Sequence, residues 1–293
     1  MWGLRRGACL RVLSPCPILS LSCGTLFPIM QYKNGRLSFA PTDLANFLAC
    51  PHKTALDLQV LEKTIEAPHW TDPITELLRE RGEEHERQYV AWLRKSGRQV
   101  VDLTGATDRV ATTAEAMRDG VEVIVQPALA RDEWYGFADV LHRVETPTGR
   151  WAWSYEAHDT KFARETRAST VLQLCVYSEL IEGVQGVCPS RFHVVMPASG
   201  SGPAPFAIET HQVSDYAAYY RFVKARLRSF AGEALQTYPE PVEHCQVCRW
   251  RQECDRQRRN DDHLSFVCGI SRLQRSELGA RGILLTDIHA CRL

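Results

Sequence analysis

The chain has 293 residues, of which 44% are hydrophobic and 24% are charged, as in an ordinary globular protein. Lysine plus arginine equals aspartate plus glutamate at 35 each, so the net charge is zero and any attraction for nucleic acid must come from a local basic patch. The 11 cysteines are an odd number, and three crowd into residues 245–254. This distribution favours a metal site in the reducing cytoplasm over a set of disulfides.

Residues 1–29 differ in pattern from the rest of the chain. Arg5 and Arg6 precede an apolar run, but three prolines interrupt it, so it is not continuous enough for a transmembrane helix. The run also lacks the A-x-A-like cleavage site that a signal peptide would require. We therefore expect no association with a membrane, and we interpret residues 1–29 as a dispensable extension or a misassigned start before Met30.

From Met30 onward, helical and strand periodicities alternate. Pro41 begins a helix with Thr42 or Asp43 as its N-cap, and Pro51 places Cys50 at the helix end. The predicted elements are helices 44–49, 72–97 and 113–119, strands 121–129, 134–144 and 151–162, helix 164–182, strands 191–196 and 206–210, and helix 214–230. The middle of the chain thus has the order αβββαβ, which predicts an α/β fold with a mixed sheet flanked by helices. We expect one domain over residues 30–262 and a helical linker over residues 263–293.

Two carboxylates and a lysine fall in predicted strands. Asp139 lies in the second strand, within Gly-Phe-Ala-Asp, and Asp159-Thr160-Lys161 closes the third. Asp159 and Lys161 are two residues apart, so both point to the same face of the sheet. Carboxylate oxygens are ligands for a hard divalent cation, and a neighbouring ammonium would orient water and offset charge on a phosphate. Glu156 lies near the same strand end but faces the opposite way, so it ranks second.

These residues resemble the signature of PD-(D/E)XK nucleases of the RecB-like branch. Asp139 matches the first acid, and Asp159-Thr160-Lys161 matches the D/E-x-K. Gln173 and Tyr177 match the Q-x-x-x-Y of the helix after the lysine, and His85, after Gly-Glu-Glu, matches the helical histidine. The resemblance implies a restriction-endonuclease-like core and a site where His85, Asp139 and Asp159 hold Mg²⁺ or Mn²⁺. It also implies that Gln173 and Tyr177 meet the DNA and the active site.

A second constellation is Cys245-x2-Cys248-x5-Cys254, preceded at a distance by Cys50. Thiolates at this spacing suit a metal ion or an iron–sulfur cluster. One cysteine before the nuclease core and three after it resemble the iron–sulfur staple of RecB-like nucleases, which implies a [4Fe–4S] cluster joining the N- and C-terminal segments. The alternative is zinc, bound by the same four thiolates or by three of them with His244.

The function that the resemblance implies is a Mg²⁺- or Mn²⁺-dependent deoxyribonuclease, an exonuclease that acts on single strands or DNA ends in repair or recombination. The alternative is a stapled DNA-binding or scaffold module without catalysis. In similar proteins a ribonuclease-H-like exonuclease or helicase domain comes next in the chain, so such a domain is an expected partner. On the helix 214–230, Arg221, Lys224 and Arg228 share one face, which either contacts phosphates or is a solvated surface.

Overall fold

A six-stranded mixed sheet forms the centre of the computed structural model, which describes residues 30–69, 72–198, 205–233 and 236–283. The strand order is β10-β9-β8-β7-β4-β3. The β3–β4 and β8–β9 pairs are parallel and the other three pairs are antiparallel. The strands are β3 (Val100–Asp102), β4 (Val123–Val125), β7 (Val140–Val144), β8 (Ser154–Thr160), β9 (Arg191–Pro197) and β10 (Phe206–Gln212). The mixed α/β architecture is confirmed.

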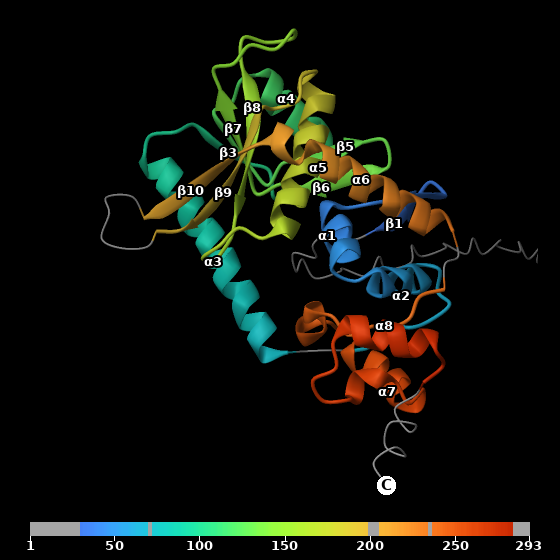
Figure 1. Cartoon of the computed structure of the whole chain (residues 1–293). Coiled ribbons are helices and arrows are strands. Elements are labelled where there is room, and N and C mark those ends of the chain that lie inside the picture. The colour runs from blue at the N-terminus through green and yellow to red at the C-terminus, as the bar shows by residue number, and fades with distance from the viewer. Residues whose placement is uncertain (1–29, 70–71, 199–204, 234–235, 284–293) are drawn as a thin grey trace, which may run out of the picture.

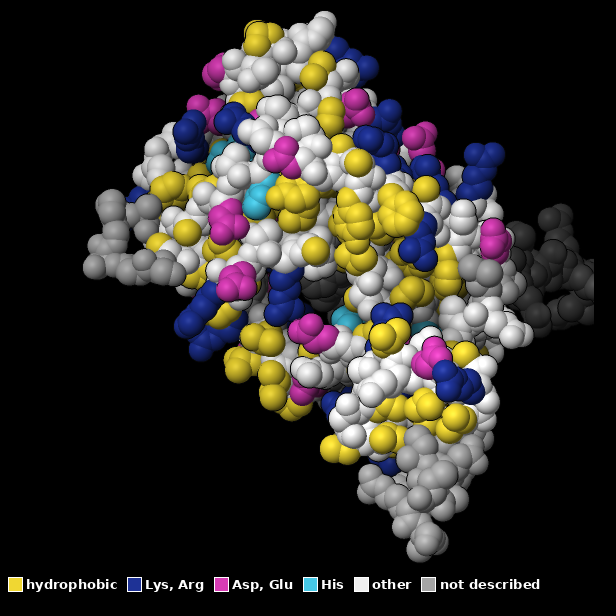
Figure 2. Space-filling model, viewed as in Figure 1, with side chains coloured by type: hydrophobic (Ala, Val, Ile, Leu, Met, Phe, Trp, Pro, Cys, Tyr) yellow, Lys and Arg dark blue, Asp and Glu magenta, His cyan; other side chains and the backbone are white. Residues whose placement is uncertain are grey.

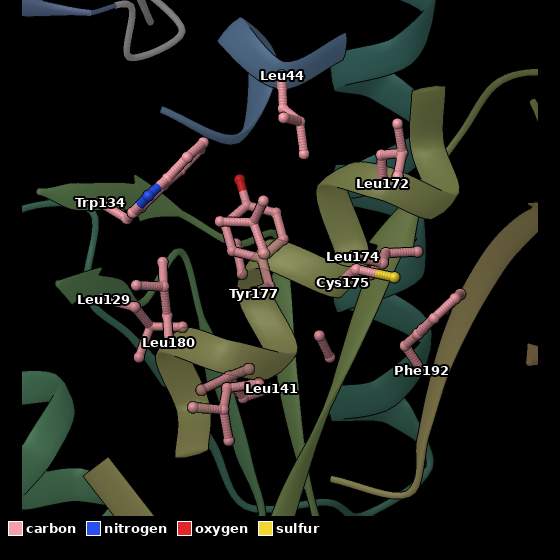
Figure 3. Packing of buried hydrophobic residues seen from close by; sticks show 14 of the residues in the cluster. Leu44, Leu129, Trp134, Leu141, Leu172, Leu174, Cys175, Tyr177, Leu180 and Phe192 are labelled. Atoms are coloured by element: carbon pink, nitrogen blue, oxygen red, sulfur yellow. The ribbon is translucent and has the colours of Figure 1, made fainter. Parts of the chain in front are cut away.

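Helices cover both faces of this sheet (Figure 1). On one face, Tyr89, Val90 and Leu93 of α3 (Pro73–Lys95) pack against Val123, Val125, Val140 and Val195. The alternate residues of the strands contact α5 (Ala168–Gln185), which together with α1 (Pro41–Ala49), α4 (Arg109–Arg118) and α6 (Val213–Gly232) encloses the main core. Leu174, Tyr177 and Leu180 of α5 lie in this core with Leu44 and Trp134 (Figure 3).

Two expected strands are each broken in the structure. The region 121–129 divides into β4 and β5 (Ala128–Arg131), because Gln126 adopts a left-handed conformation with φ of 51° that turns the chain between them. The region 134–144 divides at Ala138-Asp139 into β6 (Trp134–Phe137) and β7, and β5 pairs with β6 in a separate sheet. Asp139 therefore precedes β7 and does not lie within a strand, which corrects the prediction from periodicity.

Other boundaries were predicted closely. The helix expected over 72–97 is α3, whose N-cap Asp72 accepts from the N–H groups of Ile74 and Thr75. The N-cap expected at Thr42 or Asp43 is wrong: α1 begins at Pro41 after Ala40, and Asp43 Oδ2 instead accepts from the Ala40 N–H at 2.7 Å. The pattern did not reveal β3, α2 (Pro51–Leu61), α7 (Arg251–Asn260) or the hairpin of β1 (Gln31–Lys33) and β2 (Arg36–Ser38).

The N-terminal helices lie beside the C-terminal part of the chain (Figure 1). Asp57 of α2 accepts from the Trp250 indole at 2.9 Å and pairs with Arg249 at 2.6 Å. The C-terminal part contains η1 (Glu243–Val247), α7, η2 (Leu264–Phe266) and α8 (Arg272–Ala280). Of the helices in the described ranges, none has both the length and the apolar character needed to cross a membrane. The expectation for residues 1–29 lies outside the described residues.

Candidate functional site

The end of β8 brings Asp159 and Lys161 together on the α5 face of the sheet. Tyr155, Ala157 and Asp159 alternate along this strand, and the first two lie in the core that α5 covers. The Asp159 carboxylate is 4% exposed, and its Oδ2 lies 2.6 Å from Lys161 Nζ. The ammonium is close enough for an ion pair but not aligned for a hydrogen bond, and Oδ2 receives none from the described residues. Burial raises the pKa of Asp159 to about 6, with Asp139 adding to the rise and Lys161 opposing it.

Lys161 remains a cation in this setting. Burial lowers its pKa, but the carboxylates of Asp159 and Asp139 outweigh burial, so the net shift of the Lys161 pKa is upward. The Lys161 N–H donates to the carbonyl of Val195 at 2.9 Å, which ties the residue after β8 to β9. A positive charge is therefore maintained beside two carboxylates.

Asp139 is held against the same strand end by Thr160. Asp139 Oδ2 accepts from the Thr160 N–H at 2.7 Å and from its hydroxyl at 2.8 Å. The Asp139 carbonyl accepts from the Gln126 N–H at 2.8 Å. The break between β6 and β7 thus places the Asp139 carboxylate beside β8, where it raises the pKa of Asp159. The structure thus brings both acids to the end of β8, and their joint role as metal ligands stays a prediction.

Glu86 of α3 is a further carboxylate of this group, which the sequence motifs did not single out. Its Oε1 accepts from the Gln126 side chain at 2.6 Å. The pKa of Glu86 is raised to about 7, mainly by burial and also by the charges of Asp139 and Asp159, while Gln126 and Lys161 lower it. Glu86 directly follows His85, so the motif that singled out the histidine would have found the glutamate had the next position been weighed.

His85, the metal ligand that the resemblance implies, is buried with its ring between aromatic neighbours. His85 Nε2 lies 3.0 Å from the Val195 carbonyl, the same oxygen that accepts from the Lys161 N–H. The ring lies 6.1 Å from that of Phe162 and 5.4 Å from that of Phe206, measured between centroids. In this arrangement His85 links α3 to β9, and its metal-binding role stays a prediction.

Tyr177 and Gln173 occupy different surroundings on α5. Tyr177 is buried, and its hydroxyl donates to the Phe137 carbonyl, two residues before Asp139. Burial raises the pKa of Tyr177 well above its usual value, so the hydroxyl stays protonated and this bond persists. Tyr177 therefore positions the segment that carries Asp139. Gln173 lines a surface groove instead.

This groove has a volume of about 750 Å³ and runs between α1, the start of α5 and η1. Its polar lining includes Asn46, Arg167, Ser169, Gln173, His244 and Gln246. Figure 2 shows the surface hollowed between the body that carries the sheet and the C-terminal part. The Glu243 carboxylate lines the same groove, so its lining carries both acidic and basic groups.

The basic helix face offers less for a nucleic acid. The Lys224 ammonium is buried and pairs with Glu179 at 2.6 Å, and Arg228 pairs with Glu133. Both cations are thus engaged within the protein. Glu156, the second-ranked acid, lies on the opposite face of β8 from Asp159, where it contacts His193 at 2.8 Å and Arg191 at 3.3 Å.

The cysteines named by the sequence line one pocket in the C-terminal part. Cys50, at the junction of α1 and α2, shares it with Cys245, Cys248 and Cys254. Lys53, Arg251 and Arg258 line the same pocket. The Lys53 N–H lies 3.4 Å from Cys50 Sγ, and the Val242 N–H lies 3.4 Å from Cys245 Sγ. Burial raises the pKa of Cys248 and raises that of Cys254 to about 12, while Lys53 and Arg258 respectively oppose these rises.

Within the ranges that the structure describes, no three His, Cys, Asp or Glu side chains are arranged so that they could hold a metal ion. The ligand sets that the sequence predicts therefore remain predictions.

Comparisons with known proteins add little to this description. No family model matches the chain, and no curated protein matches it. Among solved structures, the chain is similar to the one titled "Crystal structure of SSO0001", with 14% identity and a TM-score of 0.35 over 74% of this chain and 85% of that chain. A similarity of this size carries no argument about fold or function, so the argument for function depends on the site.

Proposed function

We propose that this chain is a metal-dependent nuclease that hydrolyses phosphodiester bonds in DNA. The observation that carries the proposal is the buried Asp159 carboxylate, which repels Asp139 and has the Lys161 ammonium 2.6 Å from its Oδ2. A buried carboxylate that is repelled by a second carboxylate is costly unless cations neutralise both. Their oxygens suit Mg²⁺ or Mn²⁺, so the donor chemistry fits the predicted ion.

Asp139 and Asp159 would hold the divalent cation, and α3 would contribute a further ligand, either His85 or Glu86. When bound, such a cation polarises the phosphate and lowers the pKa of a bound water. Lys161 would orient the attacking water and offset negative charge on the phosphate oxygens. The water oxygen forms a bond to phosphorus while the bond to the leaving sugar oxygen breaks, and that oxygen takes up a proton.

The groove between α1, α5 and η1 is the proposed path of the DNA. Arg167 offers a cation to a phosphate, and Asn46, Gln173 and Gln246 offer amide donors and acceptors. Tyr177 would act at a distance, because it holds the Phe137 carbonyl and with it the segment of Asp139. We also propose that the four cysteines bind a [4Fe–4S] cluster, with zinc as the alternative, and that an exonuclease or helicase domain is the working partner.

The test is cleavage of single-stranded DNA by the purified chain with Mn²⁺. Asp159→Asn should abolish cleavage, because it removes a charge that holds the cation but preserves the side-chain shape. Lys161→Ala should retain Mn²⁺ binding and lose at least about a hundredfold in rate, because Lys161 acts on the water and the transition state. Both effects are measured as initial rates on a labelled oligonucleotide.

Asp132→Asn is the matched control, since Asp132 is an exposed carboxylate with a left-handed φ of 53° that asparagine tolerates. It should cleave like wild type. Equal residual cleavage by wild type and Asp159→Asn would identify a contaminating nuclease. That result would overturn the proposal in favour of a non-catalytic DNA-binding module.

A further inference from the structure

Glu86, His85 and Gln126 bear on which side chain of α3 serves the proposed cation site. His85 directs Nε2 to the Val195 carbonyl at 3.0 Å, and its ring lies among the aromatic rings of Phe162 and Phe206. To bind a cation through Nε2, the imidazole would have to give up this carbonyl. Glu86 needs no such exchange, because Gln126 engages Oε1 and leaves Oε2 for a further ligand.

The charge of the site gives an independent reason to expect that Glu86 binds the cation. Glu86, Asp139 and Asp159 interact electrostatically with one another and with Lys161. With all four groups ionised, three carboxylates and one ammonium leave two negative charges in a desolvated region. One divalent cation would balance the charge that remains after Lys161, whose Nζ lies 2.6 Å from Asp159 Oδ2, is counted. Carboxylate oxygens also suit Mg²⁺ and Mn²⁺ better than an imidazole nitrogen does.

We propose that Glu86, rather than His85, is the metal-binding residue that α3 contributes to the site of Asp139 and Asp159. Gln126 is the residue that positions it: its side chain holds Glu86 Oε1, and its N–H holds the Asp139 carbonyl. The left-handed φ of Gln126 lets one residue reach both acids. This inference rests on the proposed function, because it concerns the same cation.

The experiment is calorimetric titration of Mn²⁺ into the full chain without DNA. Glu86→Gln should weaken Mn²⁺ binding by about 10- to 100-fold, as Asp159→Asn should. Glu84→Gln is the matched control, because Glu84 is an exposed glutamate of the same helix that pairs with Arg87, and it should bind Mn²⁺ like wild type. His85→Ala should weaken Mn²⁺ binding less than Glu86→Gln does.

The variant Gln126→Asn tests whether Gln126 positions Glu86 without removing either acid. Asparagine tolerates the left-handed backbone but is too short to keep the bond to Glu86, so Mn²⁺ binding should weaken by about tenfold. This variant also serves if Glu86→Gln does not fold. Glu86→Gln or Gln126→Asn with wild-type affinity, while Asp159→Asn loses binding, would overturn the role of Glu86 and leave the proposed function standing. Wild-type affinity in Asp159→Asn would overturn both.

Discussion

Among the residues that the structure describes, three carboxyl groups have raised pKa values, and burial is the largest cause for each. The pKa of Asp43 rises to about 7, that of Glu86 to about 7 and that of Asp159 to about 6. Glu86 interacts electrostatically with Asp159 and Lys161. Asp43 lies apart from them, at the start of α1, where the Ala40 N–H satisfies one of its oxygens. Burial therefore raises the pKa of carboxyl groups in two separate parts of the protein.

Asp43 predicts how stability depends on pH. An acid with a raised pKa in the folded state stays protonated there while the unfolded state ionises, so stability falls as pH rises from about 4 to about 7. A shift from 3.8 to about 7 corresponds to at most about 4 kcal/mol of lost stability above pH 7. Asp43→Asn removes the titrating group and keeps an oxygen for the Ala40 N–H. Urea unfolding at about pH 5 and about pH 8 should therefore show a smaller loss in Asp43→Asn than in wild type.

Asp132→Asn, on an exposed aspartate, is the control and should lose as much stability as wild type between the two pH values. An equal loss in Asp43→Asn would show that Asp43 is ionised in the folded protein.

The proximity of Asp159 and Lys161 was predictable from simple periodicity, whereas periodicity placed Asp139 wrongly within a strand. Residues two apart in a strand share a face, so Asp159 and Lys161 had to meet. Glu86 and Gln126 were not predictable in this way. Their contact joins residues 40 apart and depends on a left-handed φ at Gln126, which no pattern of apolar residues signals. The choice between His85 and Glu86 as the metal ligand from α3 therefore arises only from the three-dimensional arrangement.

At the scale of elements, α3 has two unlike halves. From His85 to its end the helix buries Tyr89, Val90 and Leu93 against the sheet. Its first half is largely exposed, and Ile74, Leu77 and Leu78 are 69%, 52% and 55% exposed although they repeat at helical spacing. Spacing predicts that a helix has an apolar face, but it does not predict whether another element covers that face. Spacing likewise did not predict the break in the strand expected over residues 121–129. The left-handed conformation of Gln126 ends β4 within this β-branched run.

Asp72 should therefore control the first half of α3 without affecting the rest. Its carboxylate accepts from the N–H groups of Ile74 and Thr75 and from the Thr75 hydroxyl. Asp72→Ala should speed amide hydrogen exchange several-fold in the first turns of α3, because an uncapped helix end frays. Exchange at Tyr89 to Leu93 and the midpoint of thermal unfolding should stay unchanged, since those residues are held by the sheet.

Asp72→Asn is the conservative control, because asparagine is an equally good N-cap, and its exchange should match wild type. A fall in the unfolding midpoint of Asp72→Ala would mean that the first half of α3 unfolds together with the core.

At the scale of the whole molecule, segments from the two ends of the described chain form one structural part. Leu56 and Val60 of α2 pack against Cys248, Trp250 and Cys254. The resemblance to an iron–sulfur staple implied that Cys50 lies near Cys245, Cys248 and Cys254, and the four line one pocket, while their joint binding of a cluster stays a prediction. The sequence did not predict α2 and α7 as elements. α7 is short and highly polar, and α2 packs its apolar residues Leu56 and Val60 on the C-terminal part through this long-range contact.

The cysteine pocket provides a test of that long-range contact. Cys50→Ser and Cys248→Ser should lower the midpoint of thermal unfolding equally, because either change removes one ligand of the same site and releases the same long loop. Anaerobically purified wild type should contain about four irons per chain with broad visible absorbance, whereas about one zinc would establish the alternative. Cys268→Ser is the control: Cys268 is exposed in the C-terminal part of the chain, so the unfolding midpoint and metal content should match wild type. A Cys50→Ser variant with the stability and metal content of wild type would remove Cys50 from the ligand set. The contact between α2 and the C-terminal part would then depend on Asp57, Trp250 and apolar packing alone.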